Sequence, residues 1–126
     1  MTPRQHILLV DDDRDFIEAT CAVLESICDV DVAYGGGEAL DKARASRPDL
    51  ILLDVIMPDE DGFAVCEKLR ADPSLADVPV IMLTSLPDVF SPTSEARKPQ
   101  AEDYLEKPVR PAELLRRVSK FLSKES

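Results

Sequence analysis

Three short apolar runs divide the chain, and a polar residue follows each of them directly. The runs cover residues 7–10, 50–53 and 80–83. A continuous apolar run of this length is typical of a strand buried on both faces of a parallel sheet. Stretches with apolar residues at helical spacing lie between the runs. The chain therefore alternates strands with helices, which predicts an α/β domain.

Two further strands are expected at the edges of this sheet. Residues 30–33 alternate apolar and polar side chains, and residues 103–105 form a short, more polar segment. If these two strands lie at the edges and the crossovers are right-handed, the strand order is 2-1-3-4-5. We predict one doubly wound, five-stranded parallel sheet, a (βα)5 flavodoxin-like fold, with residues 1–126 as a single domain.

Local signals predict where helices and turns lie. Asp13 is placed to cap a helix after the first strand. The three glycines at 35–37 predict a turn after the second strand. The apolar face of the first helix is predicted to consist of Phe16, Thr20, Val23, Leu24 and Ile27.

Composition excludes several classes of function. The chain has 25 acidic and 15 basic residues, for a net charge of −10. Because nucleic-acid-binding surfaces need a basic stripe, we expect no direct binding to DNA or RNA. No apolar run is long enough to span a bilayer, and the N-terminus lacks the apolar run of a signal peptide. We therefore expect a cytoplasmic protein that does not bind membranes.

Polar side chains follow most of the predicted strands at the same edge of the sheet. Residues 11–13 follow the first strand, Asp54 the third, Thr84 the fourth and Lys107 the fifth. Ligands of such sheets bind at the carboxyl ends of the strands, where the winding reverses. Several carboxylates there suit Mg²⁺, and a carboxylate beside Mg²⁺ can accept a phosphoryl group. Thr84 offers a hydroxyl and Lys107 an ammonium to that group.

The ordered motifs resemble those of two-component response-regulator receiver domains, the CheY-like proteins. The resemblance covers nearly the whole chain. It is carried by residues 7–13 (ILLVDDD), 49–58 (DLILLDVIMP), 61–63 (DGF), 79–85 (PVIMLTS) and 103–108 (DYLEKP).

The resemblance implies a phosphoryl-binding site. Asp54 corresponds to the phosphoacceptor that forms an aspartyl phosphate. Thr84 and Lys107 correspond to the pair that grips the phosphoryl group. In similar proteins the Lys107–Pro108 bond is cis, and Tyr104 corresponds to the aromatic residue that swings inward when Thr84 moves.

The resemblance also implies a metal site and a set of partners. Asp11 and Asp12 correspond to the acidic pair that holds Mg²⁺, together with Asp54 and the backbone carbonyl of Ile56. The implied function is a phosphoacceptor receiver, not an enzyme with a separate substrate, although it promotes its own phosphorylation and dephosphorylation. The implied partners are a histidine kinase or histidine phosphotransfer protein, a downstream protein effector, and a second copy in a phosphorylation-dependent homodimer.

Two other functions stay open from the sequence. One is a binding module on the same scaffold that is not phosphorylated, although none of the residues such a module would lose is missing here. The other is a small phosphatase with an aspartate nucleophile, because residues 11–13 contain the Asp-x-Asp spacing. The sequence fits either a stand-alone receiver or a receiver cut from a longer chain.

One segment departs from the family pattern. Residues 85–100 contain Pro87, Pro92 and Pro99, which break a long helix, and Gln100 stands where a glycine is expected. We predict that the helix between the fourth and fifth strands is short, displaced or mobile. The family's signalling face would then differ here.

Overall fold

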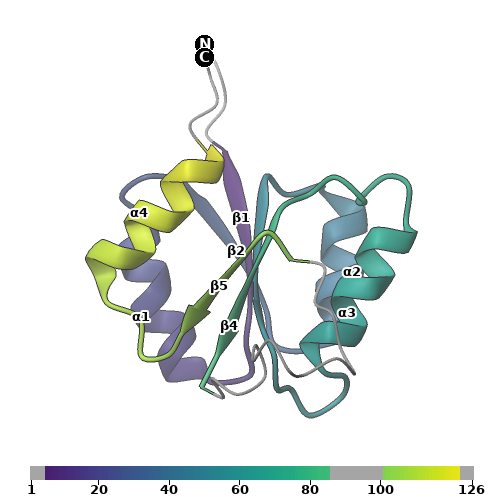
Figure 1. The fold of residues 1–126 in the computed structure, drawn as a ribbon, viewed down its shortest axis with the longest axis horizontal. Helices are drawn as coiled ribbons and strands as arrows, with labels where there is room; N and C mark the ends of the chain where they lie inside the picture. The colour runs from purple at the N-terminus through teal and green to yellow at the C-terminus, as the bar shows by residue number, and fades with distance from the viewer. Residues whose placement is uncertain (1–4, 86–100, 123–126) are drawn as a thin grey trace.

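The computed structural model describes residues 5–85 and 101–122, and these form one five-stranded sheet (Figure 1). All neighbouring strands are parallel, and their order is β2-β1-β3-β4-β5. This confirms the predicted sheet. The strands are β1 (His6–Val10), β2 (Asp29–Ala33), β3 (Leu50–Asp54), β4 (Val80–Thr84) and β5 (Asp103–Glu106).

Helices cover both faces of the sheet, as expected for a doubly wound fold. Figure 1 shows α1 and α4 on one side and α2 and α3 on the other. We predicted a short, displaced or mobile helix within residues 85–100. All of these residues except Ser85 lie outside the described part of the chain. The helices are α1 (Arg14–Leu24), α2 (Gly36–Ala45), α3 (Gly62–Ala71) and α4 (Pro111–Leu122). None of these helices is long and apolar enough to cross a membrane.

The apolar strands supply two separate cores. Successive side chains of a strand point to opposite faces of the sheet. In β3, Leu50 and Leu52 therefore pack with the α1 and α4 side, while Ile51 and Leu53 pack with the α2 and α3 side. For this reason the run of residues 50–53 in this central strand is apolar at every position. The edge strand β2 instead exposes Asp29 and Asp31.

Two local predictions are wrong. Helix α1 ends at Leu24, so Ile27 lies in the following turn and is exposed. The glycines at 35–37 do not form a separate turn, because Gly36 and Gly37 are the first residues of α2. The expected cap is confirmed: the Asp13 side chain accepts hydrogen bonds from the backbone N–H groups of Asp15 and Phe16.

Candidate functional site

Three carboxylates meet where the winding of the sheet reverses. Asp11 and Asp12 follow β1, and Asp54 ends the neighbouring strand β3. One oxygen from each lies within 4.8 Å of the others. Asp11 is 0% exposed and Asp54 is 7% exposed, while Asp12 is exposed to solvent. The structure thus brings together the acidic residues that the sequence predicted to converge.

Lys107 follows the edge strand β5, and its side chain extends to this acidic cluster. Its Nζ lies 2.6 Å from Oδ2 of Asp11 and 3.4 Å from Oδ1 of Asp54. Its backbone N–H donates to the carbonyl oxygen of Thr84 over 2.7 Å. The Lys107–Pro108 bond is cis, as the resemblance predicted. These contacts anchor the ammonium beside both buried carboxylates.

An aromatic ring also holds Lys107, and sequence reasoning missed it. The Lys107 ammonium lies 4.3 Å from the centroid of the Phe16 ring on α1. A cation at this distance from a ring is attracted by its π electrons. Phe16 was predicted only as part of the apolar face of a helix. Helical spacing cannot separate the two roles, because both are compatible with an aromatic residue on the apolar face of α1.

The charges at this site favour the binding of a cation. Burial raises the pKa of Asp54 to about 6; the negative charge of Asp11 adds to this rise, and Lys107 opposes it. Burial alone would lower the pKa of Lys107, but its hydrogen bond to Asp11 and the nearby carboxylates raise it. Three carboxylates beside one ammonium leave negative charge in excess. Oxygen ligands with excess negative charge suit Mg²⁺.

The loop after β3 is tightly folded against the phosphoacceptor candidate. The Gly62 N–H donates to the carbonyl oxygen of Val55 over 2.7 Å. A Cβ atom at Gly62 would lie 2.3 Å from the carbonyl oxygen of Asp54. Only glycine therefore fits at this position. Ile56 lies in this loop and is 53% exposed to solvent.

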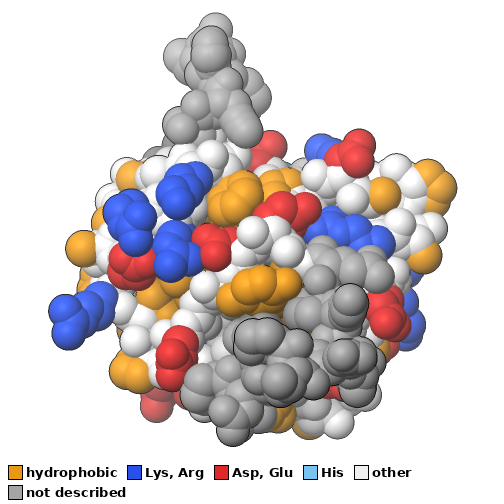
Figure 2. All heavy atoms as spheres, viewed as in Figure 1, with side chains coloured by type: hydrophobic (Ala, Val, Ile, Leu, Met, Phe, Trp, Pro, Cys, Tyr) orange, Lys and Arg blue, Asp and Glu red, His pale blue; other side chains and the backbone are white. Residues whose placement is uncertain are grey.

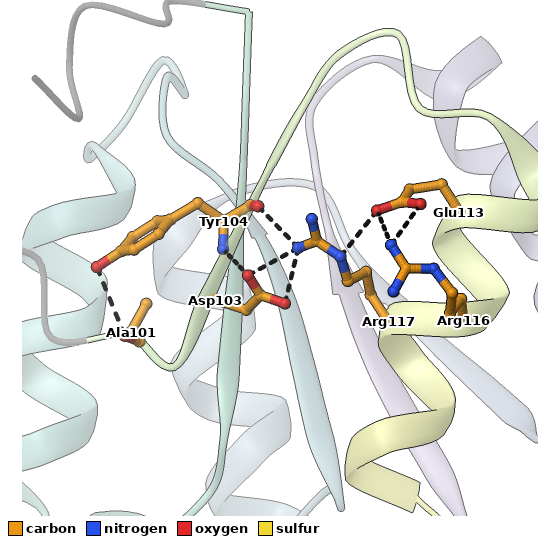
Figure 3. A network of polar contacts seen from close by, with 6 residues as sticks. All are labelled: Ala101, Asp103, Tyr104, Glu113, Arg116 and Arg117. Carbon is orange, nitrogen blue, oxygen red and sulfur yellow. Dashed lines mark hydrogen bonds and ion pairs between the residues drawn. The ribbon is translucent and has the colours of Figure 1, made fainter.

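Thr84 and Tyr104 lie on neighbouring strands but at different levels of the sheet. Thr84 ends β4 and is buried. Tyr104 pairs with Met82, closer to the start of the strands. Its hydroxyl donates to the carbonyl oxygen of Ala101 over 3.5 Å (Figure 3). The ring thus reaches back toward the start of β5, away from the edge where Thr84 lies.

Arg117 of helix α4 binds the Asp103 side chain and the Tyr104 backbone carbonyl. Arg117 donates from Nη1 to both carboxylate oxygens of Asp103, at 2.8 and 2.9 Å, and to the Tyr104 carbonyl oxygen at 3.3 Å (Figure 3). Its Nε lies 2.8 Å from Oε2 of Glu113. Figure 2 shows Lys and Arg side chains gathered on this part of the surface, with acidic groups among them. The network couples β5 to α4.

Known proteins share this sequence pattern. The profile of the response regulator receiver domain matches residues 7–119. The chain belongs to the response regulator receiver domain family. It is 42% identical over 118 residues to the DNA-binding response regulator MtrA of Mycolicibacterium smegmatis, covering 93% of this chain and 50% of MtrA.

Solved receiver structures share the fold. CheY4 of Vibrio cholerae is 30% identical, with a TM-score of 0.84 over 94% of this chain and 99% of that chain. The receiver domain of the histidine kinase PA1611 from Pseudomonas aeruginosa is 31% identical, with a TM-score of 0.85 over 96% of this chain and 99% of that chain. That structure has a magnesium ion in its active-site cleft.

Family membership confirms the resemblance and the assignment to two-component signalling. The receiver family is one of phosphoacceptors, and its members bind Mg²⁺ in the active site, as the PA1611 receiver does. The acidic cluster of this chain matches that property. The assignment favours a receiver over the small phosphatase that the Asp-x-Asp spacing left open.

The expectation that the protein does not bind nucleic acid is wrong. MtrA is named a DNA-binding response regulator, and this chain spans about half of MtrA. The net charge of −10 describes the surface of these residues only. Charge acts locally, over about 8 Å at physiological salt, so an acidic domain places no limit on a basic domain joined to it. The charge of a receiver domain therefore carries no information on whether a response regulator such as MtrA binds DNA.

Proposed function

We propose that Asp54 accepts a phosphoryl group from a phosphohistidine of a histidine kinase or phosphotransfer protein, and that residues 1–126 form one receiver domain. The observation that carries the proposal is the convergence of Asp54 with two further carboxylates and the Lys107 ammonium at one edge of the sheet. A carboxylate in such surroundings can attack phosphorus while neighbouring groups balance the charge.

The same cluster fits a magnesium ion. Asp11, Asp12 and Asp54 would hold it, together with the backbone carbonyl of Ile56. When bound, the metal would neutralise negative charge on the carboxylates and the phosphoryl oxygens. The support is the close approach of three carboxylate oxygens and the excess negative charge that the Lys107 ammonium leaves uncompensated.

The chemical step is a phosphoryl transfer. An oxygen of Asp54 forms a bond to phosphorus while the bond from phosphorus to the donor imidazole nitrogen breaks. The imidazole leaves with that electron pair and takes a proton from water. Lys107 and the hydroxyl of Thr84 donate hydrogen bonds to the phosphoryl oxygens. Attack of water on the acyl phosphate later returns the free carboxylate.

The signal would pass from Thr84 to Tyr104. When the Thr84 hydroxyl moves toward the phosphoryl group, it leaves space beside β5. Tyr104 would then turn from Ala101 toward that space. Phosphorylation would in this way shift the population from one packing of the Tyr104 ring to another. The hydroxyl contact with Ala101 supports this, since it describes the arrangement from which the ring would leave.

Incubation with acetyl phosphate and Mg²⁺, followed by intact-mass measurement, tests the proposal. We expect the wild type to gain one acid-labile phosphate, and chelation of Mg²⁺ to abolish the gain. Asp54→Asn should gain none, because an amide is not a nucleophile for phosphorus. Asp41→Asn removes a carboxylate from the exposed surface of α2 and should behave as wild type. A phosphate gained by Asp54→Asn would contradict the proposal.

A further inference from the structure

Helix α2 receives its N-terminal cap from a distant loop. Its own N-cap residue is Gly35, which has no side chain to accept the free N–H groups. Asp59 of the loop between β3 and α3 accepts them instead. Its Oδ1 lies 3.0 Å from the Gly36 nitrogen, and its Oδ2 lies 3.2 Å from the Gly37 nitrogen. These two hydrogen bonds lower the pKa of Asp59, as expected for a carboxylate at a helix N-terminus.

The glycines allow this close approach. A Cβ atom at Gly35 would lie 3.0 Å from Oδ1 of Asp59. A Cβ atom at Gly36 would lie 2.8 Å from a methyl group of Val65 on α3 and 3.1 Å from the Cβ of Glu60. The glycine run at 35–37 is therefore the surface on which the β3–α3 loop and α3 pack.

The β3–α3 loop is consequently fixed at two places. At the ends of the loop, the Gly62 N–H donates to the Val55 carbonyl oxygen, and Gly62 packs on the backbone of Asp54. In its middle, Asp59 binds the start of α2. Ile56 lies between these anchors, three residues before Asp59.

We propose that Asp59 is a positioning residue for the metal site. Its carboxylate tethers the β3–α3 loop to α2 and thereby holds the Ile56 carbonyl at the edge where Asp11, Asp12 and Asp54 meet. The inference rests on the proposed function, because it takes the Ile56 carbonyl as a metal ligand. It adds a residue that touches neither metal nor phosphate but sets how well the loop binds the metal.

A Mg²⁺ titration of ¹⁵N-labelled protein, followed by amide chemical shifts, measures the effect on affinity. We expect Asp59→Ala to raise the Kd for Mg²⁺ about tenfold, the usual scale for groups that orient metal ligands. Glu60→Gln is the matched control, because it removes one negative charge from the adjacent residue, which pairs with Lys68. The control should change the Kd less than about twofold, since the Lys68 ammonium 2.6 Å away already balances the charge of Glu60 and salt screens what remains. Equal Kd values for wild type and Asp59→Ala would overturn the proposal.

A second variant separates the tether from simple helix capping. Gly35 has an extended backbone, with φ −165 and ψ 173, and the atoms nearest to its added Cβ all belong to Asp59. Serine at this position can cap α2 itself once the Asp59 side chain is removed. The double variant Gly35→Ser with Asp59→Ala should therefore regain thermal stability and still bind Mg²⁺ weakly. Recovery of the wild-type Kd together with stability would show that Asp59 is only a cap.

Hydrogen exchange without metal distinguishes failure of the inference from failure of the proposed function. The Gly62 amide closes the loop, and we expect it to exchange faster in Asp59→Ala and in the double variant than in wild type or Glu60→Gln. Unchanged exchange overturns the tether, whatever Mg²⁺ does. A wild type that binds no Mg²⁺, with exchange faster as expected, overturns the metal site and supports the tether alone.

Discussion

Asp54→Asn is expected to stabilise the metal-free protein at neutral pH by about 3 kcal/mol. Burial and the charge of Asp11 raise the pKa of Asp54 to about 6 in the folded protein, whereas an aspartate in an unfolded chain titrates near about 4. The folded state therefore holds the proton more tightly than the unfolded state. The contribution of Asp54 is favourable below about pH 4 and is lost as the pH rises through about 6. Asparagine keeps the shape and removes the charge that opposes folding.

Urea unfolding in the presence of a chelator measures this effect across pH. The gain from Asp54→Asn should be largest at about pH 7.5 and should fall toward zero below about pH 3, where Asp54 is protonated in both states. Asp41→Asn should show no such trend, because Asp41 is exposed. An Asp54→Asn variant that is less stable than wild type at neutral pH would contradict the electrostatic description of the site.

Lys107→Met is expected to have the opposite effect, a loss of about 3 kcal/mol in the free energy of unfolding at neutral pH. Its ammonium is the partner of the fully buried Asp11 at 2.6 Å and lies 3.4 Å from Asp54. Methionine keeps most of the side-chain volume but leaves the buried carboxylates uncompensated. The loss should shrink below about pH 6, because Asp54, whose pKa burial raises to about 6, then takes up a proton.

Metal should partly rescue this variant. Anything that binds only the folded state stabilises it, by about 2.7 kcal/mol at a hundred times its Kd. Saturating Mg²⁺ should therefore stabilise Lys107→Met, while Lys120→Met on the exposed surface of α4 should unfold like wild type in urea. A Lys107→Met protein as stable as wild type in chelator would show that the ammonium does not balance the cluster.

Much of the fold and of the site follows from local sequence patterns. Central strands such as β3 are apolar up to their last residue because both faces are covered, so their apolar runs are visible in the sequence. The edge of the sheet where Asp54 and Lys107 meet follows from the rule that parallel strands end together. These features need no knowledge of individual side-chain contacts.

Other features depend on contacts between distant parts of the chain. Gly36 and Gly37 begin α2, and Asp59, more than twenty residues later, accepts their N–H groups. Phe16 holds Lys107 only because α1 and the residues after β5 are neighbours in space. Arg117 binds the β5 backbone through geometry that helical spacing does not encode. The mistaken exclusion of nucleic acid has a different cause, since the net charge of a receiver domain carries no information on DNA binding by a response regulator such as MtrA.

Locating the phosphate on the chain tests the central claim most directly. Borohydride reduces an acyl phosphate to an alcohol, so protein treated with acetyl phosphate and Mg²⁺ and then reduced should contain homoserine in place of the modified aspartate. Peptide mass spectrometry is predicted to find homoserine at position 54, in wild type only and only when Mg²⁺ was present. Homoserine at Asp11 or Asp12, with position 54 unchanged, would contradict the assignment of Asp54 as the phosphoacceptor.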